Sequence, residues 1–206
     1  MLKLFYVPNS CARASHITLR EAQAEFELQL VDFAAAEQHT AEYRQINPKG
    51  RVPALQTDRG ILTETPAILA YIAQTHPEAQ LAVLDDPYEF ARMQAFNNYL
   101  CATVHVAHAH GRRAERWADD ADAIAELQQK APGRFGDCFE LIETELFAGP
   151  WVMGSAYSVA DPYLFTLTQW LRFNKIDLAR YPRVKEHHDR MLQRTAVQGA
   201  LAAESA

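Results

Sequence analysis

The sequence predicts two domains of different fold class: an N-terminal α/β domain and a C-terminal helical bundle domain. Over residues 1–76, short alternating stretches typical of strands are interleaved with stretches of helix formers. Over residues 88–206, by contrast, one helical stretch follows another. Residues 77–87 hold two prolines and show no clear period, so we expect them to form a linker.

The elements of the first half follow a recognisable order. Residues 2–7 and 26–33 alternate as strands do, and residues 12–24 between them contain helix formers without Pro or Gly. This strand–helix–strand unit has the length of a parallel crossover. A third strand near residue 54, a turn at 58–60, a fourth strand and a helix that opens with Pro66 complete the order β-α-β-β-β-α. That order is the layout of thioredoxin-like domains.

The second half is predicted to be helical throughout. The helical stretches are residues 88–113, 122–147 with an interruption near Pro132–Gly133, 158–173 and 184–201. Ser158 and Asp161 fit a capping box at the start of the third stretch. The aromatic residues that follow are predicted to lie in the core: Tyr163, Phe165, Trp170 and Phe173.

Composition excludes several functional classes. The 20 Lys and Arg against 26 Asp and Glu give a net charge of −6, so the chain lacks the basic surface of a nucleic-acid-binding protein. No apolar run approaches the ~20 residues of a membrane-spanning helix. The first ten residues lack a signal-peptide pattern. We therefore expect a cytoplasmic protein that binds neither nucleic acid nor a membrane.

The cysteines leave open whether Cys11 is a reactive thiol or a packing residue. Cys11, Cys101 and Cys138 form no CxxC pair, and position 14 is alanine, which disfavours a dithiol redox motif and a zinc ribbon. Cys11 falls where a helix begins, and the free N–H groups and positive dipole end of a helix lower a thiol's pKa. The alternative is a small buried apolar residue. Cys101 and Cys138 are interpreted as inert packing residues.

Three motifs in order resemble one family. They are SHITLREA (15–22), INPKGRVPAL (46–55) and SVADPYLFT (158–166), and the pattern, over nearly the full chain, resembles the soluble bacterial glutathione transferases, the beta class most closely. The resemblance implies a homodimer that joins the thiolate of glutathione, its co-substrate, to a small electrophile, without a metal. The alternatives are a thiol transferase that uses Cys11 through a mixed disulfide, and a non-catalytic glutathione-binding protein.

The resemblance also implies catalytic residues. Cys11 matches the beta-class cysteine, and Ser10 is its rival because other classes activate glutathione with a serine in this loop. His105 matches a position that lines the glutathione cleft. His105, His108 and His110 have a spacing that resembles a metal site, but no helical Glu or Cys completes a zinc site, so we expect no metal.

Six further residues are implied to bind glutathione. The Val52–Pro53 bond is cis in the family, which turns the backbone of Val52 toward an approaching peptide. Thr65, expected as the N-cap before Pro66, suits the γ-glutamyl carboxylate, and Glu64 suits the ammonium. Asn98 lies two helical turns before His105 and so is expected on the same face. The complete set is Arg51, Val52, Pro53, Glu64, Thr65 and Asn98.

The chain departs from the family pattern after the second strand. Beta-class proteins usually carry a lysine there that reaches the glycine carboxylate of glutathione, whereas this chain has Phe33 followed by three alanines. Arg51 and His39 are the candidates to replace it. Residues 108–120 fall where such proteins shape the electrophile pocket, and the sequence assigns them no role.

Overall fold

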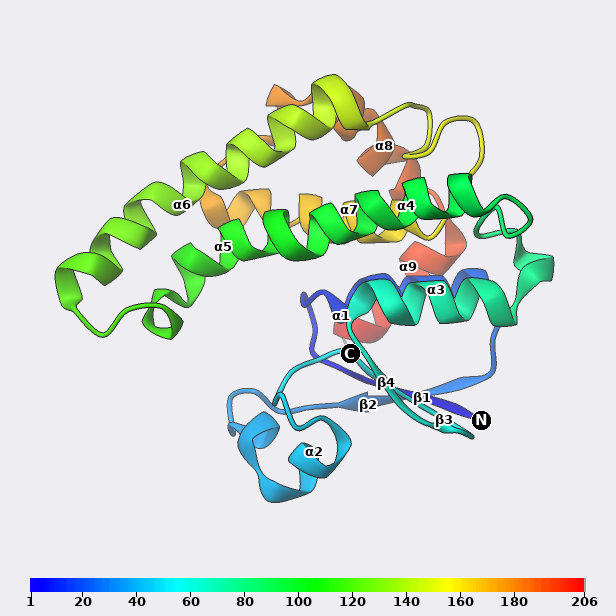
Figure 1. The fold of residues 1–206 in the computed structure, drawn as a ribbon, viewed down its shortest axis with the longest axis horizontal. Coiled ribbons are helices and arrows are strands. Elements are labelled where there is room, and N and C mark those ends of the chain that lie inside the picture. The colour runs from blue at the N-terminus through cyan, green and yellow to red at the C-terminus, as the bar shows by residue number, and fades with distance from the viewer. Residues whose placement is uncertain (206) are drawn as a thin grey trace.

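The computed structural model describes residues 1–205 and confirms the predicted fold class, a thioredoxin-like unit followed by an all-helical one (Figure 1). The first unit is built on a four-stranded sheet of order β2-β1-β3-β4. β1 pairs in parallel with β2, and β3 pairs antiparallel with both β1 and β4. The strands are β1 Leu2–Tyr6, β2 Phe26–Leu30, β3 Ala54–Thr57 and β4 Gly60–Thr63.

Three helices flank this sheet. α1 (Ala12–Glu21) and α3 (Thr65–Thr75) lie on the face toward the helical unit, and α2 (Ala41–Ile46) lies on the other side (Figure 1). Sequence reasoning missed α2, a short helix of six residues. Thr40 is a residue type that often precedes a helix, and it caps α2 because its hydroxyl accepts the backbone N–H of Tyr43 at 3.2 Å.

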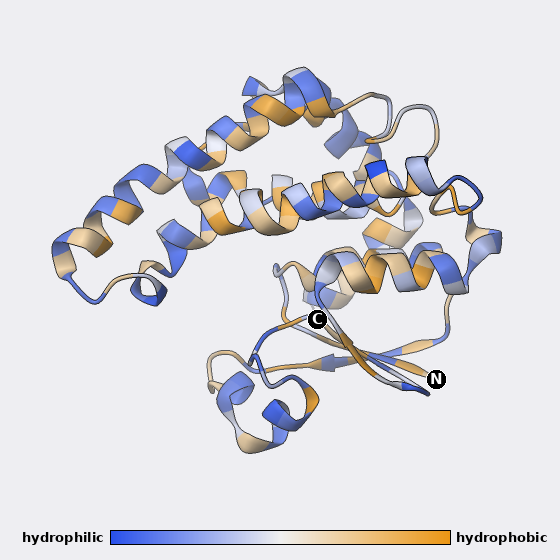
Figure 2. Cartoon of the chain, in the orientation of Figure 1, coloured by the Kyte–Doolittle hydropathy of each residue, from blue (hydrophilic) through white to orange (hydrophobic). Residues whose placement is uncertain are grey.

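The second unit packs its helices around α7, all of whose residues are buried. Figure 2 shows apolar and polar residues alternating along α5 and α6, as expected of helices with one buried side and one side in solvent. The helices are α4 Pro87–Tyr99, α5 His105–Arg112, α6 Ala121–Leu141, α7 Ala160–Thr168, α8 Pro182–Leu192 and α9 Thr195–Ser205.

Two details of the helical prediction for residues 88–147 are wrong. The stretch 88–113 is not one regular helix, because a π-helical segment, Leu100–Val104, separates α4 from α5. The stretch 122–147 is not interrupted at Pro132, which lies inside the continuous helix α6. A proline removes one backbone hydrogen bond, and Phe135 and Phe139, both fully buried one and two turns later, hold this helix in place.

The two units share one hydrophobic core that includes Leu4 and Ile68 from the first and Phe139 and Leu164 from the second. α9 returns to the first unit and packs on α1, near the C-terminus marked in Figure 1. The residue limits of the predicted domains stay a prediction. A short 3-10 turn, Pro77–Ala79, lies at the start of the expected linker. Within residues 1–205, no helix is long and apolar enough to cross a membrane.

Candidate functional site

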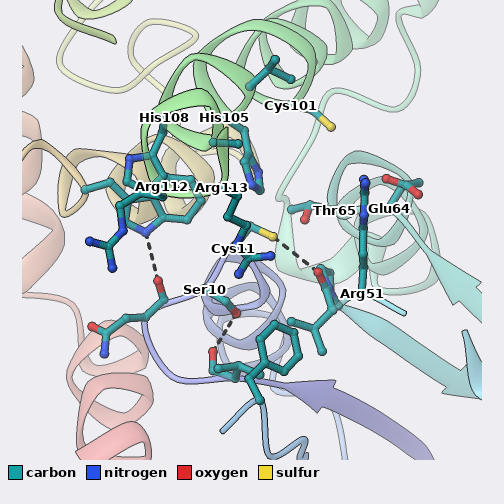
Figure 3. Close-up of a pocket in the computed structure, with 18 of the residues that line it drawn as sticks. Ser10, Cys11, Arg51, Glu64, Thr65, Cys101, His105, His108, Arg112 and Arg113 are labelled. Atoms are coloured by element: carbon teal, nitrogen blue, oxygen red, sulfur yellow. Dashed lines mark hydrogen bonds between the residues drawn. The ribbon is translucent and has the colours of Figure 1, made fainter. Parts of the chain in front are cut away.

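A cavity of about 420 Å³ lies where the two units meet (Figure 3). Its walls come from the loop before α1, the segment before β3, the start of α3, and helices α5 and α7. It contains eight of the nine residues that the sequence predicted for the site: Ser10, Cys11, Arg51, Val52, Pro53, Glu64, Thr65 and His105. The expected cis bond between Val52 and Pro53 is confirmed.

Cys11 is the residue immediately before α1, but its thiol is not activated there. The side chain is only 7% exposed, and its Sγ donates a weak hydrogen bond to the carbonyl oxygen of Val52 at 3.6 Å. Burial raises the pKa of Cys11 to about 11, against the opposing effect of a hydrogen bond with Thr65. Of the two interpretations of Cys11, the ligand-free structure agrees with the buried residue and not with a pKa lowered by the helix start, because desolvation of the thiolate is the largest effect on this group.

Ser10 is held by its own turn. Its hydroxyl donates to the carbonyl oxygen of Val7 at 2.6 Å and accepts the backbone N–H of Ala12 at 3.2 Å. Both bonds stabilise the tight turn from β1 into α1. The hydroxyl proton is thus already used inside the protein, whereas the hydrogen bond that the Cys11 thiol donates to Val52 is long, at 3.6 Å.

His105 enters the cavity from the first turn of α5 and packs edge-on against Trp170, with ring centroids 4.8 Å apart. Burial lowers the pKa of His105 to about 4, and the positive charges of nearby groups, Arg113 and Arg51 among them, lower it further. The imidazole is therefore neutral at neutral pH, and one ring nitrogen can donate a hydrogen bond while the other accepts one.

Asn98 does not line the cavity and is exposed. The same-face expectation assumed a regular helix between Asn98 and His105. The π-helical segment Leu100–Val104 adds about one residue to this interval, which rotates α4 relative to α5 by roughly 100°. Asn97 takes the buried position instead, and both polar atoms of its side chain lack a hydrogen-bond partner in the described structure.

The start of α3 differs slightly from the expectation. Thr65 is the first residue of the helix rather than its cap, and Glu64 precedes it with a positive φ of 72°. This backbone conformation is uncommon for a residue with a side chain, and such strain concentrates at functional sites. The Glu64 carboxylate pairs with the ammonium of Lys49. Thr65 itself is buried at the cavity wall.

Several residues of the cavity were missed or misread. Cys101, interpreted as an inert packing residue, lines it, and Phe173, predicted as core, is 42% exposed at its edge. His39 is exposed and does not line it, which leaves Arg51 of the two proposed replacements for the missing lysine. The stretch 108–120 contributes His108, expected in solvent or in the substrate pocket, and the largest group to which the sequence assigned no role: Ala109, Arg112, Arg113, Arg116 and Trp117.

Buried histidine and aromatic rings form one side of the cavity. His108 stacks on Trp170 with ring centroids 4.7 Å apart, and its Nδ1 lies 2.8 Å from the amide nitrogen of Asn174. Burial lowers the pKa of His108 to about 4, so this ring is also neutral. Within residues 1–205, no group of three or more His, Cys, Asp or Glu side chains is placed to hold a metal ion.

Comparisons with known proteins agree with this geometry. The family described as "Glutathione S-transferase, N-terminal domain" matches residues 1–74, and "Glutathione S-transferase, C-terminal domain" matches residues 107–190. The glutathione S-transferase GstA of Escherichia coli O157:H7 is 32% identical over 98% of both chains.

Solved structures give the same result. A glutathione transferase homologue from Sulfitobacter, solved with bound glutathione, is 38% identical with a TM-score of 0.95 over 98% of both chains. A bacterial beta-class enzyme from Sphingomonas chungbukensis is 35% identical with a TM-score of 0.85, again over 98% of both. The chain belongs to the glutathione S-transferase family.

Proposed function

We propose that this transferase conjugates the thiolate of glutathione to a small electrophile in the cavity between its two units. The observation that carries the proposal is that Cys11, the cis Val52–Pro53 segment and the start of α3 line one cavity. The backbone of Val52, which precedes the cis bond at the cavity wall, suits the backbone of a tripeptide. Glu64 and the N-terminus of α3 suit the ammonium and carboxylate of its γ-glutamyl end. The homologue from Sulfitobacter, with glutathione bound, supports this assignment.

The protonation states in the cavity favour conjugation over covalent use of Cys11. With its pKa raised to about 11, Cys11 is a thiol at neutral pH, and a thiol can donate its S–H hydrogen bond to the sulfur of bound glutathione. Neutral His105 can form a second hydrogen bond at this site, but with a pKa lowered to about 4 it is a weak base, so the proton that glutathione loses passes to water. A mixed-disulfide mechanism needs a Cys11 thiolate as the attacking group, which the burial of Cys11 disfavours.

Arg113 is the best candidate for the missing glycine-carboxylate anchor, together with Arg51. Its guanidinium lies 5.9 Å from the ring centroid of Phe33, in the segment after β2 where the lysine is expected. The Arg113 guanidinium, which comes from the helical unit, therefore lies near the position where the lysine side chain is expected to begin. The family resemblance further supports a cytoplasmic homodimer that removes reactive electrophiles, and sedimentation of the purified protein tests the dimer.

The test is a pair of turnover assays with glutathione, one on 1-chloro-2,4-dinitrobenzene and one on a small mixed disulfide. We expect turnover of the halide, and little effect of Cys138→Ala, the matched control, because Cys138 lies outside the cavity. Cys11→Ala should lower the rate on the halide without abolishing it. Turnover of the disulfide alone, abolished by Cys11→Ala, would establish a thiol transferase instead. Glutathione binding without either reaction would establish a binding protein.

A further inference from the structure

The cavity carries an excess of positive charge that the chain itself does not balance. Four arginines line it, Arg51, Arg112, Arg113 and Arg116, against the single carboxylate of Glu64. Within residues 1–205, none of these four guanidinium groups forms an ion pair. The whole chain has a net charge of −6, so this local excess of positive charge has the opposite sign to the protein as a whole.

The arginines are close enough to repel one another. Burial, followed by the charges of Arg113 and Arg51, lowers the pKa of Arg116, and only the neighbouring Glu115 carboxylate opposes this effect. Arg112 and Arg113 follow each other at the end of α5 and face the Ser10–Cys11 loop across the cavity (Figure 3). An anion bound between them would relieve this repulsion, because like charges in a partly desolvated site are weakly screened.

Glutathione accounts for only one of these positive charges. Its γ-glutamyl carboxylate and ammonium have their partners at Thr65 and Glu64 in the function proposed above. The remaining glycine carboxylate can neutralise a single guanidinium, for which Arg113 and Arg51 are the candidates. Arg112, Arg116 and one of the pair Arg51 and Arg113 are then left without a counterion when glutathione is bound.

The surroundings of Arg112 suit a flat apolar body that carries an anionic group. Its guanidinium lies 5.7 Å from the ring centroid of Phe173, which is part of the same wall as Trp170. The neighbouring His108 ring is neutral and stacked on Trp170, so it adds a further planar surface without charge. Trp117, which is 47% exposed, lines the cavity one residue after Arg116.

We propose that the second substrate is an aromatic electrophile bearing a carboxylate or another anionic group, bound by Arg112 and Arg116. This inference rests on the proposed conjugation. With a chloroaryl substrate, the glutathione sulfur forms a bond to the ring carbon, and the carbon–chlorine bond breaks. Chloride leaves with the bonding pair, and the thiol proton passes to water. The anionic group of the ring takes no part in the bond changes and serves for binding.

The test compares two products that differ only in charge. S-(4-carboxy-2-nitrophenyl)glutathione and its neutral 4-carbamoyl analogue are titrated into the protein by calorimetry. We expect the carboxylate to bind about tenfold or more tightly, the usual effect of charge-assisted hydrogen bonds from arginine. In the double variant Arg112→Gln/Arg116→Gln the ratio of the two affinities should fall toward one, with the affinity of the neutral analogue nearly unchanged.

The control variant removes one arginine charge at a position outside the cavity. Arg134→Gln removes an exposed arginine of α6 that lies outside the cavity, and it should leave the ratio intact. Equal affinities for the two conjugates, or a ratio that survives in the double variant, would overturn the inference.

Turnover separates this inference from the proposed function. The matched substrates are 4-chloro-3-nitrobenzoate and 4-chloro-3-nitrobenzamide, each rate divided by its uncatalysed rate with glutathione. Turnover of both without preference for the benzoate would retain the transferase and overturn the anionic substrate class. No turnover of either, with the charge preference intact in calorimetry, would overturn the conjugation while retaining an anion-binding cavity.

Discussion

The two groups predicted to act at the sulfur of glutathione, Cys11 and His105, are both uncharged at neutral pH. Burial is the largest cause of the pKa shift in each, upward for the thiol and downward for the imidazole. The sequence correctly indicated that Cys11 precedes a helix. It could not show that the opposite wall of the cavity, formed by distant residues, would remove water from the thiol, and desolvation depends on that tertiary packing.

The first prediction concerns the reactivity of Cys11. In the ligand-free protein, iodoacetamide should modify Cys11 at pH 7 at least about tenfold more slowly than the same residue in the urea-unfolded chain, because only the thiolate reacts. The rate should continue to rise up to pH 10, since the pKa is raised to about 11. Peptide mass spectrometry over a pH series measures both quantities. A plateau in the rate between pH 7 and 8 would show a lowered pKa instead.

At the scale of elements, most boundaries followed from local signals and the exceptions came from packing. Pro66 and the SVAD motif marked the starts of α3 and α7 within two residues, and the alternation marked β1 and β2, although β2 ends three residues before the predicted limit. The π-helical segment Leu100–Val104 has no such signal, yet it decides which asparagine points inward: Asn97 is buried and Asn98 exposed. A seven-residue spacing therefore predicts a shared face only where the helix is regular.

Asp161 has a larger structural role than capping. Its carboxylate accepts the backbone N–H groups of Val152 at 2.8 Å and Ser158 at 2.7 Å, and the Ser158 hydroxyl at 3.2 Å. It also lies 3.0 Å from Nε2 of His187 in α8. Only half of the predicted capping box is formed: Asp161 accepts the backbone N–H of Ser158, whereas the Ser158 hydroxyl accepts from Ala160 at 3.3 Å and the residue before α7 is Val159. The same buried carboxylate also joins α7 to α8 and to the loop before α7.

The second prediction follows from these contacts. Asp161→Ala should lower the free energy of unfolding by about 3–5 kcal/mol, more than the ~0.5–2 kcal/mol of an ordinary cap, because several buried donors lose their acceptor. Urea denaturation monitored by circular dichroism measures the loss. Asp120→Ala is the matched control, since this exposed aspartate caps α6 through the N–H of Ala123 alone and should cost about 1 kcal/mol.

A different outcome would change the role of Asp161. Normal stability of Asp161→Ala with a lost affinity for glutathione would place this carboxylate in the binding site. Full catalytic activity per folded molecule, in contrast, would agree with the structural role.

At the scale of the whole molecule, the two units behave as one body. They share the main core, and the buried pair of Arg13 in α1 and Glu204 in α9, with side chains 3% and 2% exposed, joins the chain ends at 2.5 Å. The order of motifs predicted the two units and their cavity. It could not predict the arginine cluster, because Arg51 and residues 112–116 are distant in sequence and only the docking of the helical unit brings them together.

The last prediction tests this unity with glutathione. The ligand-free protein should unfold in one calorimetric transition, because breaking the shared core exposes both units together. Glutathione at a hundred times its Kd should stabilise the native state by about 2.7 kcal/mol and raise Tm by roughly 5–10 °C for a chain of this size. Cysteinylglycine, which lacks the γ-glutamyl group, should give a much smaller shift at equal concentration, since Glu64 and Thr65 then have no partner. Two transitions, of which only that of the thioredoxin-like unit moves to higher temperature with glutathione, would show that the helical unit takes no part in binding. The arginines it contributes to the cavity would then act only on the second substrate.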